Sequence, residues 1–254
     1  MEFIGDIVRK TGESNLLAVE ATKASRAYEI GKDSGLFDVP KVVGFDAEAG
    51  VLEFERLNGL VTLLDLAIRR DRRLPELLKK TGQALGIIHR DLTLPEDMKH
   101  ELPPGWMAAA DENVFIHGDF ACINVCFHEP SGNLVILDWS AAPMVARTPT
   151  YGSRYFDILL FISSVFHGAP YRRILNWDAK GMADTFLKGY CEISAEVKLN
   201  DFKNYSSKIC RLQRKNIRHL ARQRRPLRAM GYMFCQTVMH ARFCLFLRRH
   251  ELPG

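Results

Sequence analysis

One stretch of the chain carries side chains whose types and spacing could do chemistry. Residues 117–138 read HGDFACINVCFHEPSGNLVILD, with Asp119, then Asn124 five residues later, then Asp138 fourteen residues beyond that. A carboxylate can accept or orient the proton of an attacking hydroxyl. An amide oxygen and a second carboxylate are suitable ligands for the Mg²⁺ of a nucleotide. These residue types in this order therefore predict phosphoryl transfer to a hydroxyl group, with a β-hairpin returning Asp138 to the loop that holds Asp119.

The same stretch resembles a known family. HGDFACIN followed by VILDWS is similar to the signature of the aminoglycoside phosphotransferase and choline-kinase-like family of small-molecule kinases. The Asp-x₄-Asn spacing is also the one that protein kinases use. The resemblance implies a two-lobed, protein-kinase-like fold in which Asp119 is the catalytic base and Asn124 and Asp138 are the magnesium ligands. His117 and Gly118 would shape the loop that carries them.

Three further segments share this resemblance, which covers roughly residues 15–165. VPKVVGFDAEAGVLEFERLNG is similar to the two strands that lead into the family's hinge, and TGQALGIIHRDL is similar to the helix ahead of its catalytic loop. GSRYFDILLFI is similar to the helix that follows, in which Asp157 would brace the catalytic loop. The C-terminal third carries no such resemblance.

The elements that must position these residues divide into two groups. Residues 1–57 predict a reduced, β-rich N-terminal lobe that binds the nucleotide. Residues 58–254 predict a mainly helical C-terminal lobe for catalysis and acceptor binding. The expected fold class is therefore α+β, a two-lobed protein-kinase-like fold.

Composition, periodicity and turn residues indicate where the individual elements lie. In the first lobe we expect strands at 3–10 and 15–21, a helix at 23–32, and a hairpin of 41–45 with 51–54. In the second lobe we expect helices at 60–70 and 74–89, a loop at 92–105, a strand–loop–strand–turn–strand order within 114–137, and helices from 155 onward.

The phosphate-gripping part of the first lobe departs from the kinase pattern. A kinase has a glycine-rich loop, a strand lysine, and a helix glutamate that pairs with this lysine. Glu29 fits the helix glutamate, but the expected lysine position holds Glu20, and Lys23 is the nearest lysine. No G-x-G-x-x-G precedes them, and only Gly5 and Gly12 are available.

Two hypotheses follow from this departure. The chain is either a kinase with an altered grip on its nucleotide or a kinase-like nucleotide-binding protein with weak or no catalysis. The intact set of Asp119, Asn124 and Asp138 favours the first, because a protein without catalysis has no physical need for all three.

Residues 51–58 are the expected hinge, where backbone groups would bind the nucleotide base. Phe54, Glu55 and Leu57 are therefore candidate nucleotide-binding residues, together with Lys23 and Glu29. Because the backbone does the recognition, side chains say little about which nucleotide is used. The resemblance implies ATP, with GTP as the alternative, and Mg²⁺ as the accompanying cofactor.

A second motif is spelled like a kinase motif but lacks its context. His89-Arg90-Asp91-Leu92 matches the catalytic-loop letters of protein kinases. Five residues after Asp91, however, stands Glu96 instead of Asn, and no hairpin ending in an aspartate follows at the right distance. We therefore interpret His89 and Arg90 as the basic end of a long amphipathic helix, close to its terminal carbonyl groups.

Composition places the chain among ordinary globular proteins. It has 254 residues, of which 47% are apolar and 26% charged, which argues against a disordered or collagen-like chain. The longest apolar-rich stretch, residues 158–166, is far shorter than the about 20 residues of a membrane-spanning helix. No secretory signal is visible, and six cysteines at this length indicate a reducing compartment. The expected location is cytoplasmic, with peripheral attachment to the inner face of a membrane as a further option.

Charge is distributed unevenly along the chain. Residues 201–254 hold 13 Lys and Arg against 2 Asp and Glu, a charge of +11, whereas residues 1–200 hold the other 22 and 28, a charge of −6. Arg211, Arg214 and Arg218 recur at helical spacing and can share one face. They are candidate acceptor-binding residues. The alternatives are contact with an acidic membrane surface or a merely solvated helix face.

The basic segment also restricts the partners. Aminoglycosides are polycations that need an acidic pocket, so a basic acceptor region disfavours them. We expect a neutral or anionic hydroxyl acceptor, a small molecule or a glycan, such as a sugar, a sugar phosphate or a phospholipid-like alcohol. A lipopolysaccharide-core-type sugar kinase acting near a membrane surface is an alternative function. Nucleic acid is not expected as a partner, because no recognised binding motif accompanies the charge.

Overall fold

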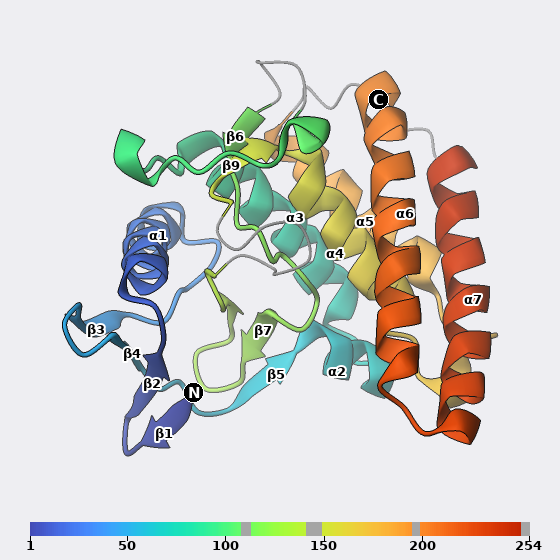
Figure 1. The fold of residues 1–254 in the computed structure, drawn as a ribbon, viewed down its shortest axis with the longest axis horizontal. Coiled ribbons are helices and arrows are strands. Elements are labelled where there is room, and N and C mark those ends of the chain that lie inside the picture. Colours follow the sequence, from blue (N-terminus) through green and yellow to red (C-terminus); the bar gives the residue numbers. More distant parts are fainter. Residues whose placement is uncertain (108–112, 141–148, 195–198, 250–254) are drawn as a thin grey trace.

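The computed structural model describes residues 1–107, 113–140, 149–194 and 199–249. They form two lobes, a small β-rich lobe at the left of Figure 1 and a larger, mainly helical lobe at the right. The expected α+β class with two lobes is therefore confirmed. Among the described residues, no helix is both long enough and apolar enough to cross a bilayer.

The small lobe is an antiparallel sheet with one helix packed against it. Its strands are β1 (Glu2–Ile4), β2 (Ile7–Thr11), β3 (Val42–Asp46) and β4 (Val51–Glu55), in the order β1-β2-β4-β3, and its helix is α1 (Ser14–Ser34). Four buried side chains of α1 belong to the same apolar cluster as Leu52 and Phe54 of β4: Leu17, Ala21, Ala24 and Ala27. The hairpin expected around Gly50 is confirmed as β3 and β4.

The strand expected at residues 15–21 is wrong, because these residues form the first turns of α1. Leu17, Ala21 and Ala24 are buried at intervals of three or four residues, which is the period of a helix face. Alanine, leucine and glutamate also have high helix propensity. The helix expected at 23–32 is confirmed as the middle of this longer helix, which ends where Gly35 adopts a left-handed φ of 63°.

The large lobe contains helices, a three-stranded sheet and a two-stranded sheet. Its elements are β5 (Leu60–Thr62), α2 (Leu63–Arg69), α3 (Leu74–Asp91), β6 (Asn113–Phe115), β7 (Val125–His128), β8 (Asn133–Ile136), β9 (Tyr151–Ser153), α4 (Tyr155–His167), α5 (Ala179–Ile193), α6 (Leu199–Arg222) and α7 (Pro226–Arg249). Short 3₁₀ turns lie at Glu96–Met98, Pro104–Trp106 and Tyr171–Arg173. The expected order of strands and helices is confirmed with two exceptions: residues 60–62 pair with β7 before α2 begins, and β9, which pairs with β6, was not expected.

A hairpin brings the two ends of the candidate motif together. β7 and β8 pair antiparallel, with Val125 opposite Ile136. Asn124 stands directly before β7 and Asp138 stands shortly after β8. The backbone N–H of Leu137 donates to the carbonyl oxygen of Asn124 at 2.8 Å. Residues fourteen apart in the sequence therefore become neighbours at one end of the hairpin.

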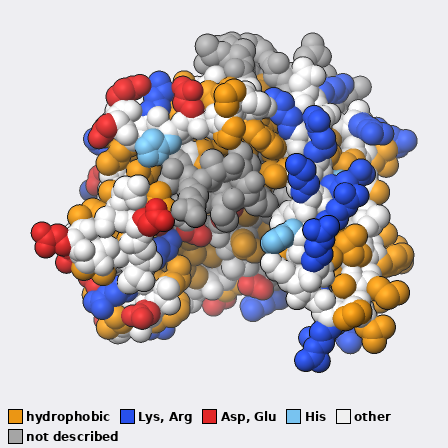
Figure 2. All heavy atoms as spheres, viewed as in Figure 1, with side chains coloured by type: hydrophobic (Ala, Val, Ile, Leu, Met, Phe, Trp, Pro, Cys, Tyr) orange, Lys and Arg blue, Asp and Glu red, His pale blue; other side chains and the backbone are white. Residues whose placement is uncertain are grey.

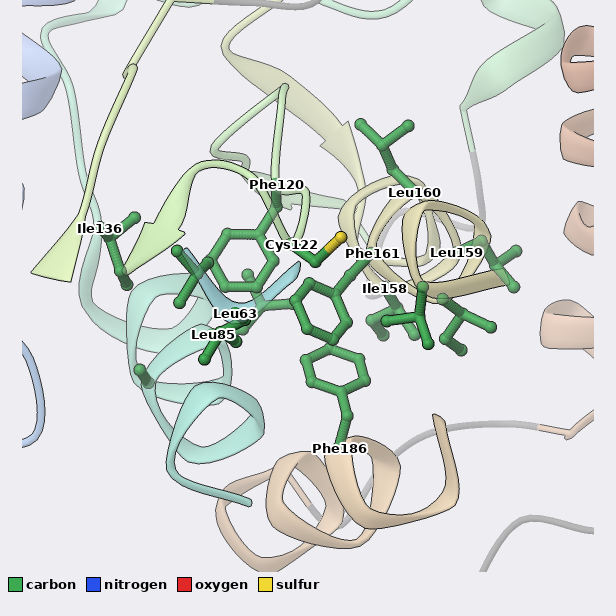
Figure 3. Packing of buried hydrophobic residues seen from close by; sticks show 14 of the residues in the cluster. Leu63, Leu85, Phe120, Cys122, Ile136, Ile158, Leu159, Leu160, Phe161 and Phe186 are labelled. Atoms are coloured by element: carbon green, nitrogen blue, oxygen red, sulfur yellow. The ribbon is translucent and has the colours of Figure 1, made fainter. Parts of the chain in front are cut away.

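The core beneath the motif is aromatic. Phe120, which follows Asp119, is fully buried, and its ring centroid lies 5.6 Å from that of Phe161 on α4. Phe186 of α5 points up at Phe161, with ring centroids 4.2 Å apart (Figure 3). Helix α5 in turn lies close against α3, since a Cβ at Gly189 would come within 2.0 Å of the Lys79 carbonyl oxygen. The loop that carries Asp119 is thus anchored in rigid packing.

Candidate active site

Asp157, in the first turn of α4, holds the start of the loop. Its carboxylate accepts hydrogen bonds from the backbone N–H groups of His117, at 2.7 Å, and Gly118, at 2.9 Å. His89 of α3 donates from Nε2 at 3.1 Å, and its Nδ1 accepts from the Tyr190 hydroxyl at 2.9 Å. Gly118 needs to be glycine, since its φ of 87° would strain any side chain. The structure therefore brings His117, Gly118 and Asp157 into one network.

Burial would raise the pKa of Asp157, but hydrogen bonds from His89 and the loop backbone outweigh this, so the pKa is lowered and the group is ionised. Burial also lowers the pKa of His89. A neutral His89 that donates from Nε2 completes the shell of donors around Asp157. A buried carboxylate with this many donors is stable as an anion.

His117 links the loop to the hairpin. Burial lowers the pKa of His117 to about 4, so the ring is neutral near pH 7. Its Nδ1 accepts from the Asp119 backbone N–H at 3.2 Å, and its Nε2 donates to the Leu137 carbonyl oxygen at 3.1 Å. The ring also lies 4.5 Å, centroid to centroid, from Trp139. One side chain thereby holds Asp119 at a fixed distance from the residue before Asp138.

Asp119 and Asn124 are joined directly. The amide Nδ2 of Asn124 donates to the Asp119 backbone oxygen at 2.9 Å and to Asp119 Oδ2 at 3.0 Å. Burial and, secondarily, the charge of Asp138 raise the pKa of Asp119 to about 7. Among the described residues, neither Asp119 Oδ1 nor Asn124 Oδ1 has a hydrogen-bond partner. Two oxygens at this point are therefore open to a ligand.

Asp138 has an unusual backbone conformation. Its φ of 57° lies in the left-handed region, which residues other than glycine seldom adopt, although aspartate tolerates it better than most. Such outliers concentrate at functional sites. Asp138 Oδ1 accepts from Lys10 Nζ at 2.8 Å and from Ser140 Oγ at 2.7 Å. Burial would raise the pKa of Asp138, but the charge and hydrogen bond of Lys10 prevail and lower it.

Lys10 and Glu20 supply the lysine–glutamate pair of the small lobe. Lys10 projects from β2 and forms ion pairs with Glu20 of α1 and with Asp138. Burial would lower the pKa of Lys10, but these two carboxylates outweigh it and raise the pKa, so the ammonium stays charged. Protein kinases pair a strand lysine with a glutamate of the following helix in the same manner. We did not predict this pair from the sequence.

Lys23 and Glu29 are therefore not the pair that we expected. Lys23 is 1% exposed, and its Nζ donates to the His117 carbonyl oxygen at 2.7 Å, so it supports the loop from below. Burial lowers the pKa of Lys23 to about 8. Glu29 is exposed, far along α1 from Glu20. The signal that could have identified the pair is the helical period that starts at Leu17, which places Glu20 on a helix and leaves Lys10 on the strand before it.

The expected hinge follows β4. Phe54 is buried beneath Lys10, whose Nζ lies 5.7 Å from the ring centroid. Glu55 accepts a hydrogen bond from the backbone N–H of Lys41 at 2.7 Å. Leu57 is half-buried, and no hydrogen bond of its backbone is seen within the described part of the chain. Its backbone groups stay candidates for binding a nucleotide base.

The remaining predicted residues lie elsewhere. Arg211, Arg214 and Arg218 are exposed on α6, and no hydrogen bond or ion pair with the described residues joins them to the loop at 117–124.

The residues of the second kinase-like motif, His89-Arg90-Asp91-Leu92, lie in two different environments. Asp91 pairs with Arg90 at the exposed end of α3, whereas His89 is buried against Asp157. The prediction that His89 and Arg90 form the basic end of a long helix is confirmed, since both lie in the last turn of α3. The expected contact of the His89 ring with terminal carbonyl groups is wrong, because the ring bonds Asp157 and Tyr190 instead.

Comparison with solved structures identifies the fold. A choline/ethanolamine kinase family protein from Mesorhizobium loti matches with a TM-score of 0.53 and 16% identity, over 97% of this chain and 88% of that one. A choline kinase from Streptococcus pneumoniae matches with a TM-score of 0.52 and 14% identity, over 98% and 88%. An amicoumacin kinase, solved with AMP-PNP and Ca²⁺, matches with a TM-score of 0.56 and 16% identity, over 95% and 80%.

The chain has the protein-kinase-like fold of these small-molecule kinases. Neither protein-family models nor curated proteins gave a match to the sequence. At this level of identity the likeness concerns the protein-kinase-like fold, and the chemistry must be argued from the side chains that the fold brings together.

Proposed function

We propose that this protein is a Mg²⁺-dependent phosphotransferase that moves the γ-phosphoryl group of ATP to a hydroxyl group of a small molecule or glycan. The observation that carries the proposal is the meeting of Asp119, Asn124 and Asp138 at one end of a hairpin, with Lys10 of the other lobe bound to Asp138. The fold shared with small-molecule kinases supports it.

Asp119 is the base in this proposal. Its Oδ2 is held by Asn124, which leaves Oδ1 to accept the proton of the acceptor hydroxyl. The oxygen of that hydroxyl then forms a bond to the γ-phosphorus, while the bond from the γ-phosphorus to the bridging oxygen breaks and ADP leaves. A pKa of about 7 suits a group that must take up a proton near neutral pH.

The residues at the end of the hairpin fit a magnesium ion. Asn124 uses its Nδ2 for Asp119, and Asp138 uses Oδ1 for Lys10 and Ser140. Among the described residues, Asn124 Oδ1 and Asp138 Oδ2 have no partner and are available to a metal ion. Amide and carboxylate oxygens are the ligands that Mg²⁺ takes from proteins, while the nucleotide phosphates supply others. Mg²⁺ bound there would neutralise negative charge on the nucleotide phosphates.

Lys10 is assigned to the phosphates of the nucleotide. Its ammonium is held between Glu20 and Asp138, so it is oriented before the nucleotide arrives. A preorganised cation costs little reorganisation when it binds an anion. The backbone of Leu57, which has no hydrogen bond within the described part of the chain, is assigned to the nucleotide base, with ATP preferred and GTP as the alternative.

The acceptor is proposed to be neutral or anionic. The charge of +11 in residues 201–254 supports this choice, because it repels a polycation at long range. The neighbours in the structural comparison include kinases named for choline and for amicoumacin. The fold therefore serves different acceptors, and the acceptor of this chain has to be found by experiment.

An ADP-release screen tests the proposal. The purified protein is incubated with ATP and Mg²⁺ and with a panel of sugars, sugar phosphates, lipopolysaccharide-core sugars, choline-type alcohols and aminoglycosides. We expect ADP release that depends on one acceptor class, that is lost in Asp119→Asn, and that is weaker with GTP. Tight nucleotide binding by calorimetry, without transfer to any acceptor, would contradict the proposal and favour a nucleotide-binding protein without catalysis.

A further inference from the structure

Helices α6 and α7 form an antiparallel hairpin at the side of the molecule that faces away from the small lobe (Figure 1). One face of α7 packs on α4, where Phe243 and Phe246 lie 5.6 and 5.4 Å, centroid to centroid, from Phe166. This buried face accounts for only part of the apolar side chains of α7.

A second apolar face of α7 points to solvent. Leu227, Met230, Phe234 and Leu245 are 85%, 70%, 64% and 46% exposed. Their spacing, with Ala241 between the last two, follows the helical period, so they form one stripe along the helix. Leaving such side chains in water costs about 1.5–3 kcal/mol each compared with burying them. A stripe of this kind indicates a surface that is covered in use.

Cations border this stripe without any acid nearby. Residues 202–249 contain 13 Lys and Arg and no Asp or Glu. Figure 2 shows Lys and Arg side chains gathered over α6, with hydrophobic side chains beside them over α7. The exposed cations comprise Arg211, Arg214, Lys215, Arg218, Arg222, Arg224, Arg225, Arg228, Arg248 and Arg249. None of them forms an ion pair with a described residue.

A groove between the two helices combines both properties. It has a volume of about 500 Å³ and is lined by Arg211, Arg214 and Arg248 together with Cys244 and Leu247. A second groove further along the hairpin shares Arg214 and Arg248 and adds Arg218 and Leu245. Both therefore present apolar surface next to guanidinium groups.

We propose that the α6–α7 hairpin is a docking surface for an anionic lipid bilayer. Surfaces that expose Phe, Leu and Met beside Lys and Arg bind at the membrane interface. Here the two kinds of side chain lie on neighbouring helices, with the apolar stripe on α7 and most of the cations on α6. The apolar stripe enters the headgroup region while the arginines contact lipid phosphates, to which their planar groups bind in bidentate geometry. The net charge of −6 in residues 1–200 turns the rest of the molecule away from the same surface.

Other occupants fit less well. A second copy of the chain, paired through the same face, would bring two sets of unpaired arginines together, and like charges repel. A nucleic acid would account for the arginines but not for Leu227, Met230 and Phe234, which have no role against a phosphate backbone. The proposal does not depend on the phosphotransferase reaction, because it concerns a different face of the molecule.

Co-sedimentation with vesicles tests the proposal, without nucleotide or acceptor. The intact chain is mixed with vesicles of phosphatidylcholine alone and with vesicles that contain about one third phosphatidylglycerol. We expect binding to the anionic vesicles only, weakening as salt is raised. Replacing Arg211, Arg214 and Arg218 by Gln should weaken binding about 100-fold, at roughly a factor of five for each cation near the surface.

Two further variants test whether apolar insertion contributes to binding and whether cations elsewhere on the surface would serve equally well. Phe234→Gln should weaken vesicle binding about tenfold while keeping the charge, because it removes one inserted side chain. A matched control removes Arg26, Lys32 and Arg72, three exposed cations elsewhere, and should change binding less than threefold. Each variant is first checked for an unchanged melting temperature.

Three results would overturn the proposal. Binding that is equal for neutral and anionic vesicles, or equal losses in the control and in the α6 variant, would remove the surface from consideration. A dimer by light scattering that Phe234→Gln converts to a monomer would assign the stripe to a second copy. Salt-dependent RNA binding that Phe234→Gln leaves intact, without vesicle binding, would assign the arginines to nucleic acid.

Discussion

Two clusters of polar side chains include residues of the loop at 117–124, and they differ in how completely their polar atoms are used. The closed cluster consists of Asp157, His89, His117 and Tyr190. Its carboxylate is 0% exposed and accepts three hydrogen bonds from the protein. The open cluster consists of Lys10, Glu20, Asp119, Asn124 and Asp138. Its Asp138 side chain is 37% exposed, and four of its side-chain oxygens have no partner among the described residues: Glu20 Oε2, Asp119 Oδ1, Asn124 Oδ1 and Asp138 Oδ2.

Residue type alone therefore does not tell whether an aspartate has a structural or a catalytic role. Both clusters contain aspartates beside potential cations, yet the closed cluster has no free group with which to bind a ligand. Its hydrogen bonds instead fix the backbone of the loop. The open cluster holds its groups in place and leaves oxygens unused, which is what binding and proton transfer require. Variants of the open cluster should therefore lose activity, and variants of the closed cluster should lose stability.

The largest effect is expected for Asp119→Asn. The amide can keep a hydrogen bond to Asn124 but cannot accept the hydroxyl proton, so kcat should fall by about 10²–10⁴-fold. Nucleotide affinity and melting temperature should change little. Steady-state ADP release, calorimetry and thermal melting measure the three quantities. In the parent, kcat/KM should rise as the pH passes about 7, because the ionised form of Asp119 is the base. Unchanged turnover in the variant would remove Asp119 from the mechanism.

The next largest effect is expected for Asp157→Ala. This change leaves the donors of His117, Gly118 and His89 unsatisfied in a buried position. We expect the free energy of unfolding to fall by about 3–5 kcal/mol, as when a buried charged network loses one partner. Urea unfolding measures it, with Asp97→Ala at an exposed site as the control, expected within about 0.5 kcal/mol. Equal stability of both variants would show that the closed cluster does not hold the loop.

The chemistry of the open cluster could be predicted from sequence only where it is contiguous. Asp119, Asn124 and Asp138 lie within one stretch, and the turn and apolar runs around them indicate a hairpin without knowledge of the rest of the fold. Prediction of the Lys10–Glu20 pair, in contrast, depends on knowing where α1 begins. A strand at residues 15–21 puts Glu20 at the position expected for the strand lysine. Glu29 is then predicted as the helix glutamate, although the glutamate that pairs with Lys10 is Glu20.

The closed cluster was predicted in part, and for a different reason. Asp157 was expected to brace the loop from a family resemblance. His89, however, reaches Asp157 from 68 residues away in the sequence, and Tyr190 reaches His89 from 101 residues away. No local pattern encodes such contacts, because they arise from the packing of α3, α4 and α5. A histidine at the end of an amphipathic helix looks the same in sequence whether it faces water or a buried carboxylate.

A smaller effect on binding is expected for Lys10→Gln. The change removes a charged hydrogen-bond donor from the nucleotide phosphates and frees Asp138 and Glu20 from their shared cation. Because hydrogen bonds to charged groups contribute about 1.5–3 kcal/mol, nucleotide affinity should weaken by roughly 10- to 100-fold. Titration calorimetry measures it. Arg9→Gln is the matched control, since Arg9 is the adjacent residue and is paired with Glu53 instead. Similar losses in both variants would remove Lys10 from the site.

Lys23 lies between the two clusters, and its lowered pKa should make the free energy of unfolding depend on pH. Burial lowers the pKa of Lys23 to about 8 in the folded chain, against 10.5 for an ordinary lysine. Between these values the unfolded chain binds more protons, so the free energy of unfolding should rise with pH. The expected slope is at most about 1.4 kcal/mol per pH unit. The difference between the parent and Lys23→Met in urea unfolding from pH 7 to 10 isolates this slope. Parallel curves would mean that Lys23 titrates normally.

The smallest effect is expected for Asp91→Asn. This variant tests whether the catalytic aspartate lies in the loop at 117–124 or in the motif at residues 89–92. Asp91 belongs to a sequence that matches the kinase catalytic motif, yet its carboxylate is 39% exposed and pairs only with Arg90, at 2.7 Å. An exposed ion pair contributes about 0–1 kcal/mol, so the free energy of unfolding should change by no more than about 1 kcal/mol. Turnover should change by no more than about twofold, because Asp91 takes no part in the proposed reaction. The variant makes the same chemical change as Asp119→Asn, and the two are compared in one ADP-release assay. A loss from Asp91→Asn as large as that from Asp119→Asn would place the reacting groups at the end of α3 and deprive the open cluster of its role.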